Sequence, residues 1–286
     1  MAETKENIPE IKQREAGMTL CVGAQGVGKT YLHMYVIRDY VRDKIETKVK
    51  GRKCLIFDTN GEFTQKQFEE NGIPNFQIQT IKMRDIEAWG LSNRVECRRV
   101  DAKALSIDEK IKCVSYIINK YRDGMLVLED INTYILSVTH MGDIISGLVN
   151  LRHRGVDILI SYQDFRAVEP RIFSNSRWFR FHYQSVDVME VKAKIPNVEL
   201  CSIAQIIVNN RYFNDDIRFY LYVYKNIQKV RGKFSKDEFY VACREYLNGS
   251  RSIIKTLMNR KKISEDEAIK IQSDFYYKMY YGNDDK

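Results

Sequence analysis

Residues 23–30 read Gly-Ala-Gln-Gly-Val-Gly-Lys-Thr, and this stretch decides the fold of the chain. It matches the phosphate-binding loop pattern G-x-x-x-x-G-K-[ST] at every fixed position. The apolar run 18–22 before it predicts a buried strand. Residues 30–37 after it predict a helix, with Leu32, Val36 and Ile37 on one face. A strand, a glycine-rich loop and a helix in this order are the usual setting of such a loop, so the sequence predicts nucleotide binding.

The residue types in this loop suit a polyphosphate. Glycines at 23, 26 and 28 adopt backbone angles that other residues resist, so successive N–H groups can turn toward phosphate oxygens. The following helix points its partly positive N-terminus at the same anion. Lys29 is expected to reach the β- and γ-phosphates and the Thr30 hydroxyl to complete a Mg²⁺ shell, so the predicted cofactors are ATP and Mg²⁺. The alternative is an ordinary glycine-rich turn, which the flanking strand and helix disfavour. The predicted nucleotide-binding residues are Gly23, Ala24, Gln25, Gly26, Val27, Gly28, Lys29, Thr30 and Tyr31.

The composition is that of a globular protein, since 44% of the 286 residues are hydrophobic and only four are proline. The length fits one large α/β domain and a small appendage. The N-terminus lacks the apolar stretch of a secretory signal, and no apolar run approaches the roughly 20 residues that span a bilayer. The six cysteines form no C-x-x-C pair, and the four histidines show no metal-ligand spacing. We therefore expect an intracellular protein with reduced cysteines, no membrane span and no zinc site.

A second chemical element stands at 125–130, Met-Leu-Val-Leu-Glu-Asp. Four apolar residues followed by two acids form the Walker B pattern, in which a buried strand carries carboxylates to the phosphate end of the sheet. Glu129 is expected to hold Mg²⁺ through its water, and Asp130 to polarise the attacking water. The usual order is Asp and then Glu, and the reversed order here leaves open which of the two activates the water. The alternative is a strand that merely ends in two exposed acids.

A third strand is predicted at 156–161 and is followed by Tyr162 and Gln163. A polar residue at a strand tip beside Walker B lies where a sensor of the γ-phosphate is needed, and Gln163 fits that position. Arg152 and Arg154 stand just before this strand and are expected to face outward. They can act as a finger on the transition-state charge of a neighbouring subunit, or as cations at a helix C-terminus that the helix dipole favours. The local sequence does not distinguish between these two roles.

The rest of the chain supplies further strands and then helices. Strands are predicted at 53–58, 76–81, 95–100, 178–183 and 217–224, and a helix at 108–121. From about Asn226 the composition changes to charged helices at 235–247, 250–262 and 264–281. Two of them open on the capping boxes Ser235/Glu238 and Ser264/Glu267. This predicts a flexible N-terminal arm at 1–15, a P-loop ATPase domain at 16–226 and a helical C-terminal domain at 227–286.

Four stretches carry a family resemblance: GAQGVGKTY (23–31), LIFDTNGEF (55–63), MLVLEDINTY (125–134) and LRHRGVDILISYQDF (151–165). In this order they resemble the FtsK-HerA group of P-loop ATPases, above all the viral DNA-packaging ATPases and the Zot-like phage proteins. The second is similar to the strand ending in Asp-x-x-Gly-Glu-aromatic of HerA-like proteins. The fourth is similar to the Arg-His-x-Gly-x-Asp strand of Zot-like proteins, which closes on Ser/Thr-x-Gln. The resemblance covers about residues 16–185, and the fourth stretch is its most specific part.

The resemblance implies an α/β fold with a RecA-like (ASCE) core of three α/β/α layers, in which one strand separates those of Walker A and Walker B. It also implies a homo-oligomeric ring, a pentamer or a hexamer, that hydrolyses ATP at its subunit interfaces. In such a ring Gln163 is the sensor, and Arg152 or Arg154 is the trans finger. Zot-like proteins usually carry a transmembrane segment, which this chain lacks. Small-phage packaging motors often append a nuclease-like domain, but residues 227–286 are short and helical and show no acidic triad, so no nuclease activity is predicted.

The leading hypothesis is an ATP-driven translocase of double-stranded DNA, a viral genome-packaging motor that works in the host cytoplasm with the portal or capsid vertex as a further partner. The net charge of +8 and the pI of about 9.0 are compatible with DNA binding, but many basic proteins bind none. The candidate DNA grips are 44–53, 84–99 and 260–262, each of which also fits a solvated face. A virion assembly or export ATPase that acts on protein is the second hypothesis, and a small-molecule phosphotransferase is the third. The Glu129–Asp130 pair and Gln163 favour hydrolysis coupled to mechanical work.

Overall fold

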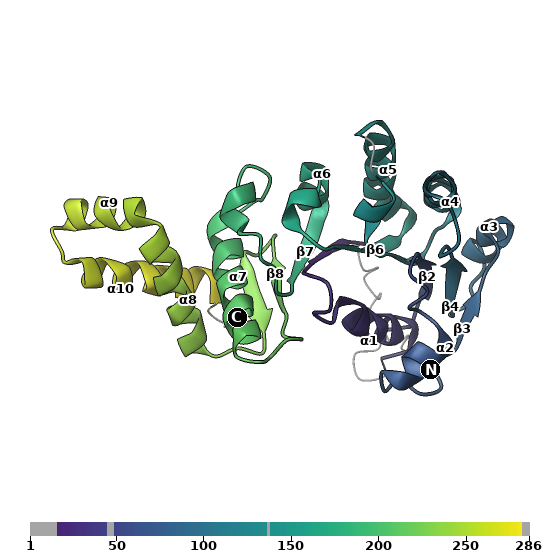
Figure 1. The fold of residues 1–286 in the computed structure, drawn as a ribbon, viewed down its shortest axis with the longest axis horizontal. Coiled ribbons are helices and arrows are strands. Elements are labelled where there is room, and N and C mark those ends of the chain that lie inside the picture. Colours follow the sequence, from purple (N-terminus) through teal and green to yellow (C-terminus); the bar gives the residue numbers. More distant parts are fainter. Residues whose placement is uncertain (1–15, 45–48, 136–137, 282–286) are drawn as a thin grey trace, which may run out of the picture.

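A nine-stranded sheet runs through the molecule, and seven of its strands are parallel (Figure 1). The computed structural model describes residues 16–44, 49–135 and 138–281, so the arm predicted at 1–15 lies outside the described residues. The strands are β1 (Met18–Val22), β2 (Lys53–Asp58), β3 (Ile78–Thr80), β4 (Cys97–Asp101), β5 (Gly124–Leu128), β6 (Val156–Tyr162), β7 (Ser176–Phe181), β8 (Leu221–Tyr224) and β9 (Lys229–Gly232).

The order across the sheet is β3-β4-β2-β5-β6-β1-β7-β8-β9. β6 therefore lies between β1, which leads into the glycine-rich loop, and β5, which leads to the two acids. This is the separation by one strand that the family resemblance implies. The register aligns Val22 with Tyr162 and Leu128 with Ile160, so the loops after β1, β5 and β6 leave the sheet at one edge. In open parallel sheets ligands bind at this carboxyl edge.

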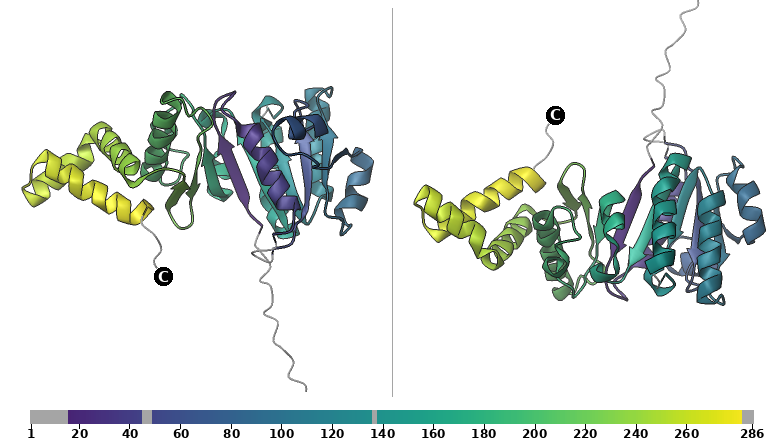
Figure 2. Two further views of the ribbon diagram at one scale, coloured as in Figure 1. Left: turned by 90° about the horizontal axis from the view of Figure 1, so that it is seen from below. Right: turned by 90° about the horizontal axis from the view of Figure 1, so that it is seen from above.

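Helices cover both faces of the sheet, which confirms the predicted three-layer α/β/α class (Figure 2). α1 and α2 pack on one face, and α3, α4, α5 and α6 pack on the other. α7 and α8 pack against each other, with α7 also against the strands β7–β9. The helix bounds are α1 Lys29–Val41, α2 Gln65–Glu70, α3 Ile86–Gly90, α4 Ile107–Lys120, α5 Val138–Leu151, α6 Pro170–Asn175, α7 Val198–Phe213, α8 Lys236–Gly249, α9 Arg251–Lys261 and α10 Glu265–Tyr276.

The central strands are buried along their whole length because both of their faces are covered. In β2, Leu55 and Phe57 join the larger core beneath α3–α6, whereas Cys54 and Ile56 join the smaller core beneath α1 and α2. The alternation follows from the two-residue period of a strand. Continuous apolar runs at 54–57, 125–128 and 158–160 were therefore correctly predicted as buried strands.

The buried face of α1 differs from the predicted one. Leu32 and Val36 are only half-buried, whereas His33, Met34 and Ile37 are buried together with Lys29. The reason is that the helix turns His33 inward, where its ring contacts the Glu129 carboxylate. A search for apolar residues alone could not have placed a histidine at the centre of that face.

The end of the sheet also differs from the prediction. β8 begins at Leu221 and not at Ile217, because residues 216–219 form a turn in which the Phe219 N–H donates to the Asp216 carbonyl. β9 was not predicted, and it pairs with β8 in the same sheet. The sheet thus extends past the boundary predicted between residues 226 and 227, and the helical segment begins with α8.

The three C-terminal helices follow the predicted ranges closely. Ser235 and Glu238 form a full capping box at the start of α8. Ser264 caps α10 by accepting from the Glu267 N–H, without the return bond from the glutamate. α9 and α10 form an antiparallel arm that projects from the body of the molecule (Figure 1). Across the described residues, no helix has both the length and the apolar character that crossing a membrane requires.

Candidate nucleotide-binding site

The loop between β1 and α1 has the shape that a phosphate cradle needs. Gly26 and Gly28 have φ of 81° and 85°, a region in which a side chain is strained. Gly23 is required for a different reason, because a β-carbon there would lie 2.5 Å from the β-carbon of His182. The loop is fixed to the sheet by the Gly23 N–H, which donates to the Tyr162 carbonyl at 3.2 Å, and by the Ala24 N–H, which donates to the Tyr183 carbonyl at 2.7 Å.

Lys29 and Thr30 lie at the first turn of α1 and point toward different partners. The Lys29 Nζ donates to the carbonyls of Gly23 at 2.6 Å and Ala24 at 2.8 Å, so its ammonium lies along the loop and has no carboxylate partner among the described residues. The Thr30 Oγ1 donates to the Oε2 of Glu62 at 2.9 Å. One cation and one hydroxyl are thus presented at the N-terminus of a helix, where an anion is favoured.

Glu129 is buried at the end of β5 beside α1. Its Oε1 lies 2.9 Å from the Nδ1 of His33, and the two share a hydrogen bond in the interior. Burial, followed by the nearby charge of Glu62, raises the pKa of the Glu129 carboxyl to about 8. Burial also holds the pKa of His33 well below its usual range, so this imidazole is neutral. The pair therefore places a carboxyl that resists ionisation at the predicted Mg²⁺ position.

We expect Glu129→Gln to remove a pH dependence of stability. Between pH 4.5, the ordinary value for this carboxyl, and about pH 8, the folded protein keeps a proton that the unfolded chain has lost. The free energy of unfolding therefore falls with rising pH by at most about 1.4 kcal/mol per unit through this group. The glutamine variant has no such proton, so its free energy of unfolding does not fall in this way. The free energy of unfolding of the wild type should therefore fall relative to that of the variant as pH rises. Urea unfolding at pH 5, 7 and 9 without divalent ions measures the free energy of unfolding of both proteins. The same change with pH in both would contradict the prediction.

Asp130 and Gln163 are brought together by the neighbouring strands β5 and β6. The Gln163 Nε2 donates to the Oδ2 of Asp130 at 3.0 Å, and the Asp130 N–H donates to the Ser161 Oγ at 3.1 Å. Asp130 has φ of 42°, so the chain turns sharply after β5 and aims its side chain at β6. The other oxygen of Asp130 is buried and has no partner among the described residues. The predicted sensor and the second predicted acid thus form one unit.

Glu62 is a site residue that sequence reasoning missed. It follows β2, which pairs directly with β5, and its carboxylate reaches the Thr30 hydroxyl. The loop that carries it is held by Asp58, whose carboxylate accepts the N–H groups of Gly61, Glu62 and Phe63. The signal was present in the stretch LIFDTNGEF, whose acid and Gly-Glu pair were noted as a family resemblance but not assigned to the site.

A cavity of about 400 Å³ joins these groups at the carboxyl edge of the sheet. This volume is within the range of small-molecule sites. Oxygen donors from Thr30, Glu62 and Glu129 face it, and such donors suit Mg²⁺, which proteins usually hold with one or two carboxylates plus phosphate oxygens. In the part of the chain that the structure describes, no group of three or more His, Cys, Asp or Glu residues gathers as a metal site by itself. The residues present therefore fit an ion that arrives with a nucleotide.

Arg218 is a second residue near the loop that the sequence did not indicate. Its guanidinium carbon lies 4.6 Å from the centre of the Tyr31 ring, and its side chain passes beside Gly28. The centre of the Tyr35 ring lies 4.9 Å from the centre of the Tyr31 ring. Arg218 stands between α7 and β8, far from the loop in sequence, and no local pattern marks it.

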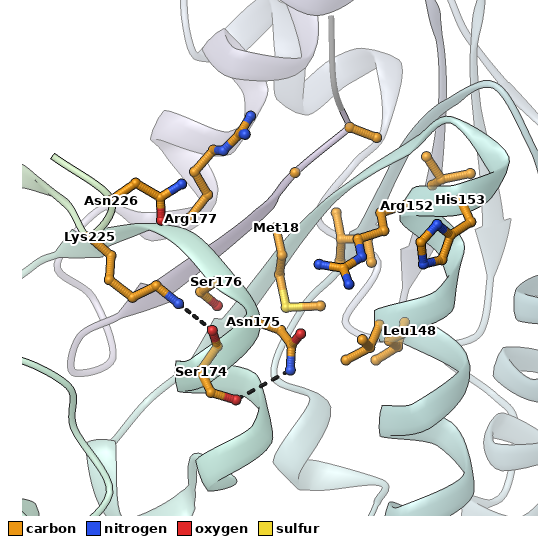
Figure 3. Close-up of a pocket in the computed structure, with 15 residues that line it drawn as sticks. Met18, Leu148, Arg152, His153, Ser174, Asn175, Ser176, Arg177, Lys225 and Asn226 are labelled. Atoms are coloured by element: carbon orange, nitrogen blue, oxygen red, sulfur yellow. Dashed lines mark hydrogen bonds between the residues drawn. The ribbon is translucent and has the colours of Figure 1, made fainter.

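Arg152 and Arg154 lie at the opposite edge of the sheet, before β6. Arg154 donates from Nη1 to the carbonyls of Ile118 at 2.9 Å and Asn119 at 2.7 Å, and so caps the C-terminus of α4. Arg152 is exposed, and its side chain has no hydrogen-bond or ion-pair partner among the described residues. It borders a second cavity, of about 440 Å³. Figure 3 shows Arg152 and Lys225 on opposite sides of this cavity.

The comparisons with known proteins concern the fold. No protein-family model and no curated protein matches the sequence. Among solved structures, the genome packaging NTPase B204 from Sulfolobus turreted icosahedral virus 2 in complex with AMP is similar, with a TM-score of 0.47 and 14% identity over 77% of this chain and 97% of that one. The DNA-packaging ATPase B204 from Sulfolobus turreted icosahedral virus gives 0.48 and 14% over 76% and 97%. The N-terminal domain of zonular occludens toxin from Neisseria meningitidis gives 0.33 and 16% over 60% and 78%. These are the two kinds of protein that the sequence motifs resemble.

Proposed function

We propose that this chain is an ATPase that drives double-stranded DNA through a homo-oligomeric ring, as in the packaging of a viral genome. The observation that carries the ATPase assignment is the meeting of Lys29, Thr30, Glu129, Asp130 and Gln163 around one cavity. The cation and the loop N–H groups suit a triphosphate, and the acids with Gln163 suit the activation of water. The Glu129–Asp130 pair together with Gln163 favours hydrolysis over transfer of the phosphoryl group to a small molecule.

Each side chain has a task in hydrolysis. Lys29 would leave the loop carbonyls to bind the β- and γ-phosphates, where it offsets charge in the transition state. Thr30 and Glu129 would hold Mg²⁺, which supplies charge neutralisation between the phosphates. Gln163, fixed by its bond to Asp130, would contact the γ-phosphate and sense its loss. Because Gln163 directly follows a strand of the central sheet, a movement of Gln163 when the γ-phosphate leaves can be transmitted to the rest of the subunit.

The position of Arg152 supports a site completed by a second subunit. The seven residues of β6 separate it from Gln163, and such a strand spans roughly 20 Å. An arginine at that edge cannot reach the nucleotide of its own subunit. In a head-to-tail ring it can reach the nucleotide of the next one. Because Arg154 caps α4, we assign the trans finger to Arg152.

The contacts of the basic residues support the tail cluster as the DNA grip. In the region 84–99, Arg98 pairs with Glu96 at 2.8 Å and Arg99 with Asp58 at 2.8 Å. In the region 44–53, part of which lies outside the described residues, the Lys53 ammonium is bound to the Gly90 and Ser92 carbonyls. The tail cluster, defined as Arg260, Lys261 and Lys262, is exposed on the projecting arm, and no carboxylate pairs with it in the described part of the chain. These cations are available for phosphate contacts.

We expect the triple variant Arg260→Ala, Lys261→Ala, Lys262→Ala to bind duplex DNA more weakly and with less dependence on salt. If all three cations contact phosphates, the slope of log affinity against log salt decreases in size by up to about 3. Fluorescence anisotropy with a labelled duplex between 50 and about 200 mM salt measures both effects. The triple variant Lys110→Ala, Lys112→Ala, Arg122→Ala removes the same charge from the α4 region and serves as the control. Equal slopes for both variants would show that the tail cluster does not contact the DNA.

A further inference from the structure

The site holds three carboxylates, and their surroundings differ in a way that separates their roles. Glu129 is buried, and one of its carboxyl oxygens is engaged with His33. Asp130 is engaged with Gln163. Glu62 is exposed to solvent and lines the cavity, and the Thr30 hydroxyl is the single partner of its carboxylate among the described residues. Of the three, Glu62 is the carboxylate that a water molecule in the cavity can reach most freely.

The position of Glu62 is built into the fold. Asp58 is buried, and its two oxygens accept three consecutive N–H groups at 2.8, 3.1 and 3.1 Å. The Nη1 of Arg99 also donates to Asp58, at 2.8 Å, which adds a further contact to this anchor. Gly61 has φ of 75°, and Phe63 is fully buried on the other side of Glu62. A backbone held in this way points one side chain at the first turn of α1, which is the kind of support that a reacting group needs.

We propose that Glu62 is the catalytic residue that takes the proton from the attacking water. The inference rests on the proposed ATPase function. In the step, a lone pair of the water oxygen forms the bond to the γ-phosphorus, and the bond from that phosphorus to the β–γ bridging oxygen breaks. ADP leaves with the electron pair of the broken bond, and the proton of the water passes to a Glu62 oxygen. The protonated Glu62 carboxyl then releases the proton to solvent and becomes a carboxylate again, so ATP and water give ADP, phosphate and a proton.

The reversed Glu-Asp order leaves open which of the two acids activates the water, and a base at Glu62 resolves this. Glu129 is left to the metal and Asp130 to the sensor Gln163, so neither has to act as the base. The base comes from β2, the strand next to β5, and the Thr30 hydroxyl holds it beside the metal position. A group of this kind contributes little to the binding of ATP, because it acts on the water and not on the nucleotide.

The test compares Glu62→Gln with wild type and with Glu70→Gln, an exposed glutamate on α2 near the same loop. We expect the Glu62 variant to lose turnover by a factor of about 10²–10⁴ while its affinity for Mg²⁺·ATP stays within a few-fold of wild type. Chromatography of the bound nucleotide should show ATP retained in this variant and ADP in wild type. Glu62→Asp, which keeps a carboxylate, should turn over faster than Glu62→Gln.

Three results would overturn the assignment: turnover of Glu62→Gln equal to that of Glu70→Gln, turnover of Glu62→Asp no higher than that of Glu62→Gln, or a loss that added Mg²⁺ restores. The last would show that Glu62 serves the metal alone. Thermal unfolding confirms that each variant is folded, which the exposure of Glu62 leads us to expect. A wild-type protein without any ATP turnover would instead refute the proposed function, so the two failures are distinguishable.

Discussion

Lys29→Ala should reduce ATP turnover by at least about a hundredfold, because it removes the cation that we expect to offset charge on the β- and γ-phosphates. In the part of the chain that the structure describes, the Lys29 ammonium bonds to two loop carbonyls and to no carboxylate, so its removal leaves no unpaired buried charge there. Losing hydrogen bonds of this kind costs on the order of 1 kcal/mol each, which a domain of this size tolerates. Turnover at saturating ATP and a thermal unfolding curve measure the two effects.

Lys112→Ala is the matched control for this experiment. Lys112 is an exposed lysine on α4, and its side chain has no hydrogen bond or ion pair among the described residues. Its removal changes the net charge by the same amount without touching the loop. We expect wild-type turnover from the control and a folded, inactive protein from Lys29→Ala. Undiminished turnover in Lys29→Ala would show that residues 23–30 are not part of the active site.

Arg152→Ala should reduce turnover by about a thousandfold or more if Arg152 is a trans finger, since fingers of this kind contribute that much to phosphoryl transfer. ATP binding should be retained, because the loop, Lys29 and Thr30 all lie at the other edge of the sheet. Arg154→Ala should behave differently. It removes the cap of α4, so it should lower the melting temperature more than it lowers turnover. Arg122→Ala, an exposed arginine after α4, serves as the control.

Mixing the two inactive proteins decides whether Arg152 acts in trans. In a head-to-tail ring made from equal amounts of Lys29→Ala and Arg152→Ala subunits, about one quarter of the interfaces pair an intact Lys29 with an intact Arg152. The mixture should therefore hydrolyse ATP well above either protein alone. If the mixture is as inactive as its parts while mixed rings are shown to form, Arg152 has a structural role and the finger must be sought elsewhere.

Much of the fold was predictable because its signals are local. The loop pattern with its strand and helix, the apolar runs of β2, β5 and β6, and the charged C-terminal helices are each contained in a short stretch of sequence. The separation of β1 from β5 by one strand was implied by the family resemblance and not by periodicity. β9 was missed because a four-residue strand with Lys229 and Arg231 has no apolar alternation to mark it.

The site was only partly predictable because its remaining contacts join distant segments. Glu62 and Thr30 are 32 positions apart, and His33 and Glu129 are 96 apart, so no local pattern pairs them. The two readings of Arg152 and Arg154 were equivalent in sequence. Both arginines follow the C-terminus of α5, and Arg154 differs from Arg152 in that it also bonds to two carbonyls at the end of α4. The sequence could identify the residue types that the chemistry needs, but the fold decides which of them meet.

The central claim is that ATP hydrolysis is coupled to double-stranded DNA, and steady-state turnover with and without DNA tests it most directly. The assay compares no DNA, a long duplex and the matching single strand, each at low and moderate salt. We predict strong stimulation by the duplex that declines as salt rises, because the grip depends on phosphate contacts. Turnover that no nucleic acid changes would contradict the claim and direct the search to a protein partner.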